Sequence, residues 1–108
     1  MSPLIIFDKN DNFFLTVGSP GGKAIISYVF KSLVSILYLK EDITKAIESP
    51  NYIKIKDRVF IESDDLNDNL NRIGKKRSLT SGLAIIKKNQ KYFSAAADSR
   101  RDGTVRGN

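Results

Sequence analysis

The sequence predicts a mixed α/β domain built in layers, a single partial domain over residues 1–108 that is cut from a thicker fold. Patterns typical of strands and helices follow one another in the order ββ, α, α, β, α, ββ. The two N-terminal apolar runs lack polar alternation, which is typical of strands covered on both faces. A long helical segment has only a narrow polar stripe and should be surrounded by protein. A chain of 108 residues does not easily supply so many covering layers.

The first elements are a β-hairpin and a helix. Leu4 to Phe7 and Phe13 to Val17 are apolar runs, and the Asn- and Asp-rich segment 8–12 between them suits a turn. The segment GSPGGK, residues 18–23, then leads into the apolar segment Ala24 to Leu39. Polar residues recur every four positions here, which predicts a helix with one polar stripe formed by Lys23, Ser27, Lys31 and Ser35.

The middle of the chain predicts two further helices and an extended segment. Asp42 to about Ser49 has helical spacing and is stopped by Pro50. Tyr52 to Ile61 alternates and is expected to be extended. Ser63 can cap a third helix, which Gly74 would end as a C′ glycine. The basic run that follows, Lys75 to Arg77, is expected to be a solvated loop.

The C-terminal part predicts a last pair of strands and a tail. Leu83 to Ile86 and Tyr92 to Ala97 are the strands, with the polar segment 87–91 as their turn. The tail from Asp98 to Asn108 has little apolar content, so we expect it to fray unless something packs on it. Ion pairs with a structural role are expected at the end of the last strand, among Asp98, Arg100, Arg101 and Asp102.

Composition excludes several kinds of chemistry. The chain has no Cys and no His, which removes disulfides, thiolate nucleophiles, imidazole bases and the usual ligands of transition metals. We expect no cofactor and no metal, because Asp64, Asp65 and Asp68 lie beside a helix start, where carboxylates favour the dipole anyway. We expect no membrane span, because the apolar segment 24–39 has 16 residues, against about 20 for a bilayer.

The net charge raises the question of nucleic acid. The chain has 18 Lys and Arg against 12 Asp and Glu, which gives +6. Most of the positive charge comes from Lys, whereas phosphate-binding surfaces favour the forked guanidinium of Arg. We therefore expect no nucleic-acid partner, although a small basic binding module remains an alternative.

The segment GSPGGK leaves two interpretations open. Gly21 and Gly22 have no Cβ atoms, so they can adopt positive φ and allow another group close to the backbone. Two free amides at the start of a helix favour an anion, including the oxyanion of an attacked carbonyl. The other interpretation is a turn that only joins a strand to a helix. Neither GxxxxGK[ST] nor GxGxxG is present, which excludes a P-loop and a dinucleotide fingerprint.

Four blocks, taken in order, resemble a known family. They are Met1-Ser2-Pro3, GSPGG at 18–22, AIESP at 46–50 and AAADSRRDG at 95–103. Together they are similar to the C-terminal half of the small subunit of the gamma-glutamyltransferases (gamma-glutamyltranspeptidases). The resemblance covers essentially all 108 residues, and the GSPGG and DxRRDG blocks are its most specific parts.

The resemblance implies an N-terminal-nucleophile (Ntn) hydrolase fold with αββα layers. Such an enzyme is made as a precursor that cleaves itself and exposes a threonine at the start of the small subunit. That threonine attacks the gamma-glutamyl amide of glutathione or a related donor, and the acyl group passes to water or an amino acid. The resemblance gives Gly21 and Gly22 the role of oxyanion hole, and the missing layers would come from the rest of the enzyme.

The sequence also departs from the family pattern. In the family, two serines that hold the donor's α-carboxylate precede the Met-Ser-Pro stretch, whereas this sequence begins at Met1; Ser2 itself is expected to be structural. The nucleophilic threonine and the large subunit lie further upstream, so no catalytic residue is expected here. An internal threonine cannot replace a chain-terminal one, whose own amine is the base, and this excludes Thr16, Thr44, Thr80 and Thr104.

The expected function is therefore that of a C-terminal fragment of a gamma-glutamyltransferase, inactive alone. Its expected partners are the missing N-terminal part of the enzyme, meaning the large subunit and the start of the small subunit, and glutathione or another gamma-glutamyl donor after assembly. The start at Met1 suggests a split or decaying gene, so a non-catalytic remnant is the alternative. The family is usually periplasmic, extracellular or at the cell surface, and nothing in the chain indicates its own location.

Overall fold

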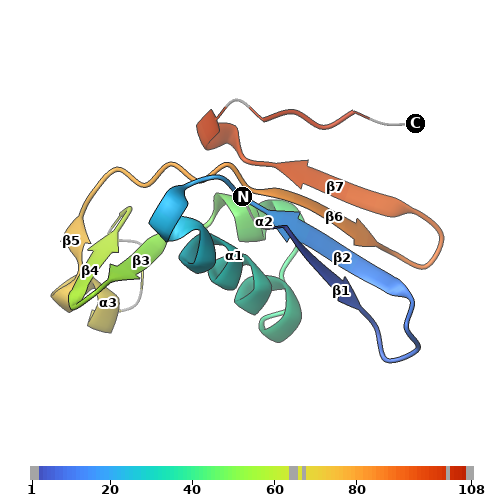
Figure 1. Cartoon of the computed structure of the whole chain (residues 1–108), viewed down its shortest axis with the longest axis horizontal. Coiled ribbons are helices and arrows are strands. Elements are labelled where there is room, and N and C mark those ends of the chain that lie inside the picture. The colour runs from blue at the N-terminus through green and yellow to red at the C-terminus, as the bar shows by residue number, and fades with distance from the viewer. Residues whose placement is uncertain (1–2, 64–65, 67, 102, 107–108) are drawn as a thin grey trace.

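A computed structural model describes residues 3–63, 66, 68–101 and 103–106 of the chain. Figure 1 shows two sheets with helices packed between and beside them. Five residues that belong to predicted motifs or to a predicted helix start lie outside the described residues. They are Met1, Ser2, Asp64, Asp65 and Asp102.

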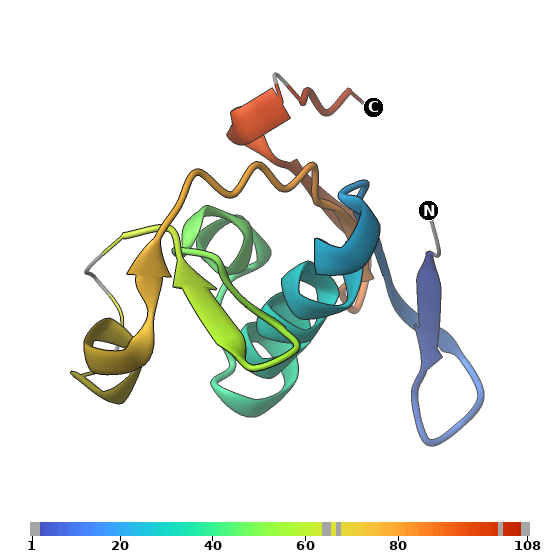
Figure 2. The same ribbon diagram turned by 60° about the vertical axis from the view of Figure 1, so that its left-hand side comes forward.

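The larger sheet has four antiparallel strands in the order β1-β2-β6-β7. Their bounds are β1 Leu4–Phe7, β2 Phe13–Gly18, β6 Ala84–Lys88 and β7 Phe93–Ala97. The N-terminal hairpin and the C-terminal pair are thus confirmed, with small shifts at the ends. Figure 2 shows β1 at the outer edge of this sheet, and β2 joins the two hairpins by pairing with β6.

The predicted long helix is three consecutive helical pieces. The 3-10 turn η1, Gly22–Ala24, leads into α1, Ile25–Leu33, and a π-helical turn η2, Val34–Tyr38, ends it. The next helix, α2, Ile43–Glu48, is confirmed and ends just before Pro50. None of the helices in the described part of the chain has the length and apolar character that a bilayer crossing requires.

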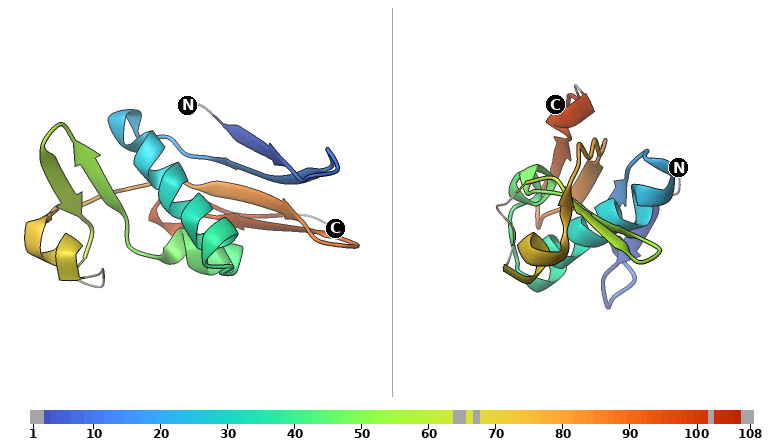
Figure 3. Two further views of the ribbon diagram at one scale, coloured as in Figure 1. Left: turned by 90° about the horizontal axis from the view of Figure 1, so that it is seen from below. Right: turned by 90° about the vertical axis from the view of Figure 1, so that its left-hand side faces the viewer.

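Both helices lie on one face of the four-stranded sheet (Figure 3). The inward residues of the strands form the core with Tyr28, Ile36 and the apolar face of α2. These inward residues are Leu15, Val17, Ile85 and Ala96. Because side chains alternate along a strand, the other face of the sheet carries Ile5, Ile86 and Phe93, all exposed. The chain itself thus covers one face of these strands, and the second covering layer that the sequence indicates is not supplied by the described residues.

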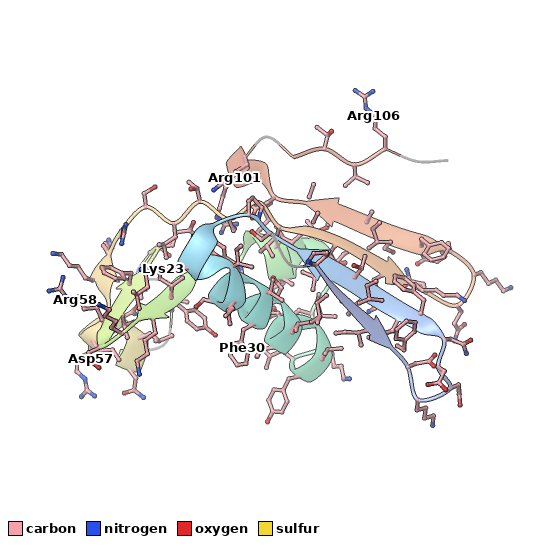
Figure 4. The ribbon with its side chains drawn as sticks, viewed as in Figure 1. Lys23, Phe30, Asp57, Arg58, Arg101 and Arg106 are labelled. Carbon is pink, nitrogen blue, oxygen red and sulfur yellow. The ribbon has the colours of Figure 1, made fainter. Side chains whose placement is uncertain are left out.

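The polar stripe of the long helix is divided between two environments, because Lys23 is exposed whereas Lys31 and Ser35 face inward. Lys31 is only 3% exposed, and Ser35 is also buried. The Lys31 Nζ donates hydrogen bonds to the carbonyls of Ile47, at 3.2 Å, and Ser49, at 2.9 Å. Phe30 and Ile26 are exposed instead, and Figure 4 shows Phe30 pointing away from the sheet. Protein therefore surrounds Lys31 and Ser35, while part of the apolar surface of this helix, at Ile26 and Phe30, is open.

The smaller sheet corrects three expectations. It contains β3 Tyr52–Ile55, antiparallel β4 Arg58–Ile61 and a short parallel strand β5 Lys75–Lys76. The segment 52–61 is thus a hairpin that turns at Lys56, which has φ 54°, and the basic run is partly a strand. The third helix, α3 Asp68–Ile73, precedes Gly74. That glycine lacks the positive φ of a C′ cap; an added Cβ would lie 2.5 Å from the Ile61 Cγ2.

We expect Ile47→Ala to lower the free energy of unfolding by about 2–4 kcal/mol, because truncating a buried isoleucine leaves a cavity. Ile47 is 1% exposed, whereas Ile26, also an isoleucine in a helix, is 82% exposed. Ile26→Ala is the matched control and should change the stability by less than about 0.5 kcal/mol. Urea unfolding measures both variants. Equal losses would contradict the assignment of the covered face.

Candidate functional site

The GSPGGK loop has the backbone that the sequence predicts for an anion site. Gly21 has φ 138° and Gly22 has φ 58°, both in the region that favours glycine. The Gly21 carbonyl accepts the N–H of Ala24 at 3.1 Å and so starts η1. Among the described residues, none accepts a hydrogen bond from the N–H of Gly21 or Gly22. Two unpaired amides therefore lie at the start of the helical segment.

The two glycines differ in what surrounds them. A Cβ on Gly21 would lie 2.8 Å from the Tyr28 Cε2, so the Tyr28 ring packs directly against the loop. A Cβ on Gly22 would meet nothing within 4 Å. Gly21 is therefore fixed by packing within this chain, whereas Gly22 faces open space.

A second segment, residues 78–83, holds the loop in place from the other side. Ser19 is fully buried, and its Oγ accepts the N–H of Gly82 at 3.0 Å and donates to the carbonyl of Pro20 at 2.8 Å. A Cβ on Gly82 would lie 2.9 Å from Pro20 and from Arg101, so only a glycine permits this close contact. The position of the loop thus depends on the path of segment 78–83.

That path is set by the buried carboxylate of Asp98. Its Oδ2 accepts hydrogen bonds from the Ser81 hydroxyl and, at 3.1 Å, from the Leu83 N–H. The Asn51 side chain donates to the Ser81 Oγ at 3.0 Å. Burial by itself raises the pKa of the Asp98 carboxyl, but hydrogen bonds from Ser81, Leu83 and Arg100 outweigh it and hold the pKa below its ordinary value.

Arg100 connects Asp98 to the rest of the molecule. Its Nη1 lies 2.9 Å from Asp98 Oδ1, and its Nε and Nη2 contact both oxygens of Glu62 at 2.6 and 2.7 Å. The same guanidinium donates to the carbonyls of Ile47 and Ser49 at the end of α2, at 2.8 and 3.0 Å. Hydrogen bonding to Glu62 outweighs burial and raises the pKa of Arg100. This forked, two-point contact with a carboxylate is the strong form of an ion pair.

These contacts confirm one expectation and correct another. The ion pair expected at the end of the last strand exists between Asp98 and Arg100, and residues 99–101 form the 3-10 turn η3. The start of the tail is therefore anchored, not frayed. Arg101 makes no such pair; its Nε donates to the carbonyl of Thr80 at 3.0 Å.

Sequence reasoning missed the partners of this cluster. Asn51, Glu62, Ser81 and Lys31 come from four separate segments and share no spacing that marks them as a group. The sequence signal that could have indicated the cluster is a polar residue inside an apolar pattern, such as Lys31. In the described part of the chain, no three acidic side chains come close enough to hold a metal ion.

Comparison with known proteins identifies the family of the chain. A family model described as Gamma-glutamyltranspeptidase matches residues 1–107. The chain belongs to the gamma-glutamyltranspeptidase family. The glutathione hydrolase proenzyme of Bacillus subtilis (strain 168) is 32% identical over 118 residues, which cover 99% of this chain and 20% of that protein.

Solved gamma-glutamyltranspeptidases share the fold. A mutant of the Helicobacter pylori enzyme has a TM-score of 0.79 at 27% identity, covering 93% of this chain and 60% of that chain. The Pseudomonas nitroreducens enzyme complexed with L-DON has a TM-score of 0.83 at 19% identity, covering 99% and 61%. The predicted Ntn hydrolase fold is thus confirmed as a partial one. The chain spans about one-fifth of the curated relative and about three-fifths of these structures.

Asp98→Asn should lower the free energy of unfolding at neutral pH by about 2–4 kcal/mol, because the partly buried Arg100 then loses one of its two partner carboxylates. The control is Asp57→Asn in the exposed β3–β4 turn, with an expected change within about 0.5 kcal/mol. The depressed pKa of Asp98 stabilises the fold above pH about 4, and this contribution is lost as pH falls through the folded-state pKa. Urea unfolding across acidic pH should therefore show a shallower loss for Asp98→Asn; an unchanged slope would contradict it.

The buried Lys31 predicts an alkaline dependence of stability. Burial, followed by repulsion from Arg100, lowers the pKa of Lys31 from 10.5 to about 8. Between these values the unfolded chain binds more protons than the folded chain, so stability rises with pH, by at most about 1.4 kcal/mol per pH unit. Lys31→Met should remove this rise, measured by urea unfolding between pH 8 and 10. Lys45→Met, at a largely exposed lysine, should keep it, and a rise that persists in Lys31→Met would refute the assignment.

Proposed function

We propose that the chain is the C-terminal part of a gamma-glutamyltransferase small subunit and supplies its oxyanion hole, while the rest of the enzyme supplies the nucleophile. The observation that carries the proposal is the pair of unpaired amides at Gly21 and Gly22, beside open space. The membership of the family supports it.

In the proposed reaction, a chain-terminal threonine of the remaining part attacks the gamma-glutamyl carbonyl of glutathione or a related donor. Its own amine takes the hydroxyl proton. Negative charge develops on the carbonyl oxygen, and the N–H groups of Gly21 and Gly22 donate hydrogen bonds to it. The amine part of the donor leaves, and water or an amino acid then takes the acyl group.

The supports of the loop fit this role. An oxyanion hole is effective when its donors need no rearrangement as charge develops. Gly21 is packed against Tyr28, and Ser19 is tied to Gly82, so the amides are held before any substrate arrives. The open space beside Gly22 leaves room for the reacting carbonyl.

The open apolar faces support the proposal that this chain packs against the rest of the enzyme. The outer face of α1 exposes Ile26 and Phe30, and the outer face of the sheet exposes Ile5, Ile86 and Phe93. Large apolar side chains exposed together on two faces are typical of interaction sites. On this proposal the chain alone has no transferase activity, and a non-catalytic remnant is the competing possibility.

Co-production with the missing part tests the proposal. The chain would be produced together with a polypeptide that carries the large subunit and the start of the small subunit of the Bacillus subtilis relative. The assay is transfer from a gamma-glutamyl anilide to an amino acid. We expect activity from the pair and none from either piece. A co-purifying pair without activity would reject the catalytic role. Activity of the chain alone would reject the proposal that the nucleophile comes from the other polypeptide.

The variant Gly22→Ala tests the oxyanion hole in the same pair. A Cβ there meets nothing in this chain, so the fold is retained, but it occupies the space proposed for the reacting carbonyl. We expect kcat to fall about 10- to 100-fold, the scale of one displaced donor. Asp11→Ala is the control, because it also places an alanine at a positive φ, 63°, but in the distant β1–β2 turn. Equal activities of the two variants would contradict the role of Gly22.

A further inference from the structure

A basic cleft lies beside the GSPGGK loop, between the start of α1, strand β3 and segment 77–80. Its volume is about 310 Å³, within the range of small-molecule sites. Three cationic side chains line it, Lys23, Arg77 and Arg101, together with Gly21 and Tyr28. Among the described residues, no carboxylate lines it. The cleft therefore offers positive charge next to the proposed catalytic loop.

Among the described residues, none of these three cations forms an ion pair with a carboxylate. Such pairs instead join Lys45 to Glu41, and Arg100 to Glu62 and Asp98. Arg101 uses its Nε for the Thr80 carbonyl, which orients its fork and leaves the terminal nitrogens available. Arg77 lies over the Phe60 ring, with its guanidinium carbon 5.0 Å from the centroid. Both guanidinium groups are thus oriented without being neutralised.

Tyr28 adds a neutral donor to the wall of the cleft. The residue as a whole is buried, but its hydroxyl is not one of the buried unpaired polar atoms, and it has no hydrogen-bond partner among the described residues. Burial, and then the charge of Glu62, raises the pKa of Tyr28, so the hydroxyl keeps its proton. An accessible hydroxyl of this kind can donate to a ligand that accepts hydrogen bonds.

The basic surface continues along the β3–β4 hairpin. A second hollow of about 480 Å³ shares Lys23 and Arg77 with the first and adds Lys56 and Arg58, against a single acid, Asp57. Figure 4 shows Lys23 between the start of α1 and the hairpin, Arg101 near η3 and Arg58 at the end of the hairpin. The shape suits an extended ligand with more than one negative charge.

We propose that this cleft, formed by Lys23, Tyr28, Arg77 and Arg101, binds the carboxylates of an acidic peptide that serves as acceptor for the gamma-glutamyl group. The positive charge of the site favours an acidic ligand. The use of this peptide as an acceptor rests on the proposed function. A nucleic acid fits less well, because single strands bind by stacking bases on exposed aromatic rings. Here the Phe60 ring is covered by Arg77, and Tyr28 is buried.

Binding to the full chain tests the site without any turnover. The probes are the dipeptides Glu-Glu and Gln-Gln, titrated by calorimetry and by NMR. The double variant Lys23→Gln/Arg77→Gln removes two cations at exposed positions, and Lys9→Gln/Arg106→Gln removes two exposed cations elsewhere. We expect Glu-Glu to bind, more weakly as ionic strength rises, with Kd about tenfold higher in the cleft variant and within about twofold in the control.

Further arms keep the outcome decisive. Tyr28→Phe preserves the ring that packs on Gly21 and should still weaken Glu-Glu binding, even if the double variant unfolds. Equal affinity for Gln-Gln, equal losses in both double variants, or tighter binding of a single-stranded oligonucleotide in the same cleft would overturn the proposal. In the assembled pair, the cleft variant should raise KM for Glu-Glu and leave KM for the donor unchanged.

The two proposals fail separately. If the assembled pair shows no transfer while Glu-Glu still binds through Lys23 and Arg77, only the catalytic role is lost. If transfer occurs and Glu-Glu neither binds nor acts as a better acceptor than Gln-Gln, only the acidic-peptide site is lost.

Discussion

The contact between Arg100 and Asp98 joins the separate parts of this chain. Arg100 follows the last strand of the larger sheet, and its fork also binds Glu62 after β4 and the last carbonyls of α2. One guanidinium thus links both sheets and a helix. From Asp98 the contacts continue through Ser81 and Leu83 to the segment that presses on the GSPGGK loop. The geometry of the two glycine amides therefore depends on a charge pair at the other end of a hydrogen-bonded chain.

The cluster around Arg100 stabilises the fold only while all of its members are present. A charge pair removed from water gains little overall, but breaking one leaves an uncompensated charge in a poorly solvated place. Arg100 and Lys31 donate to the same carbonyls at the end of α2, and Glu62 binds Arg100, so loss of one partner also affects the others. The pKa values of Asp98 and Lys31 are both depressed, but for opposite reasons: hydrogen bonds stabilise the charge of Asp98, whereas burial and Arg100 destabilise the charge of Lys31.

The molecule is less compact than expected for its length, which agrees with surfaces that another polypeptide covers. Its radius of gyration is 14.3 Å, and its extents are 43 × 30 × 23 Å. A compact domain of this length is expected near about 13 Å. The excess arises because the four-stranded sheet has helices on one face only, while the smaller sheet lies beyond the start of α1 (Figure 1). In the αββα layers of an Ntn hydrolase, the open face of such a sheet is the one that packs against a second sheet, while the helices form an outer layer.

The residue pattern predicted nearly every strand and helix, because apolar spacing is local, and it located the loop through its two glycines. It did not predict the turn at Lys56 or the cluster around Arg100, since these depend on contacts between segments far apart in the sequence. The orientation of α1 shows the deeper reason. Amphipathic patterns are interpreted by assuming that the polar side meets water. Here Lys31 turns inward and donates to two carbonyls at the end of α2, while Ile26 and Phe30 of the same helix stay exposed. A local pattern cannot predict this orientation, because it depends on acceptors that come from a different segment.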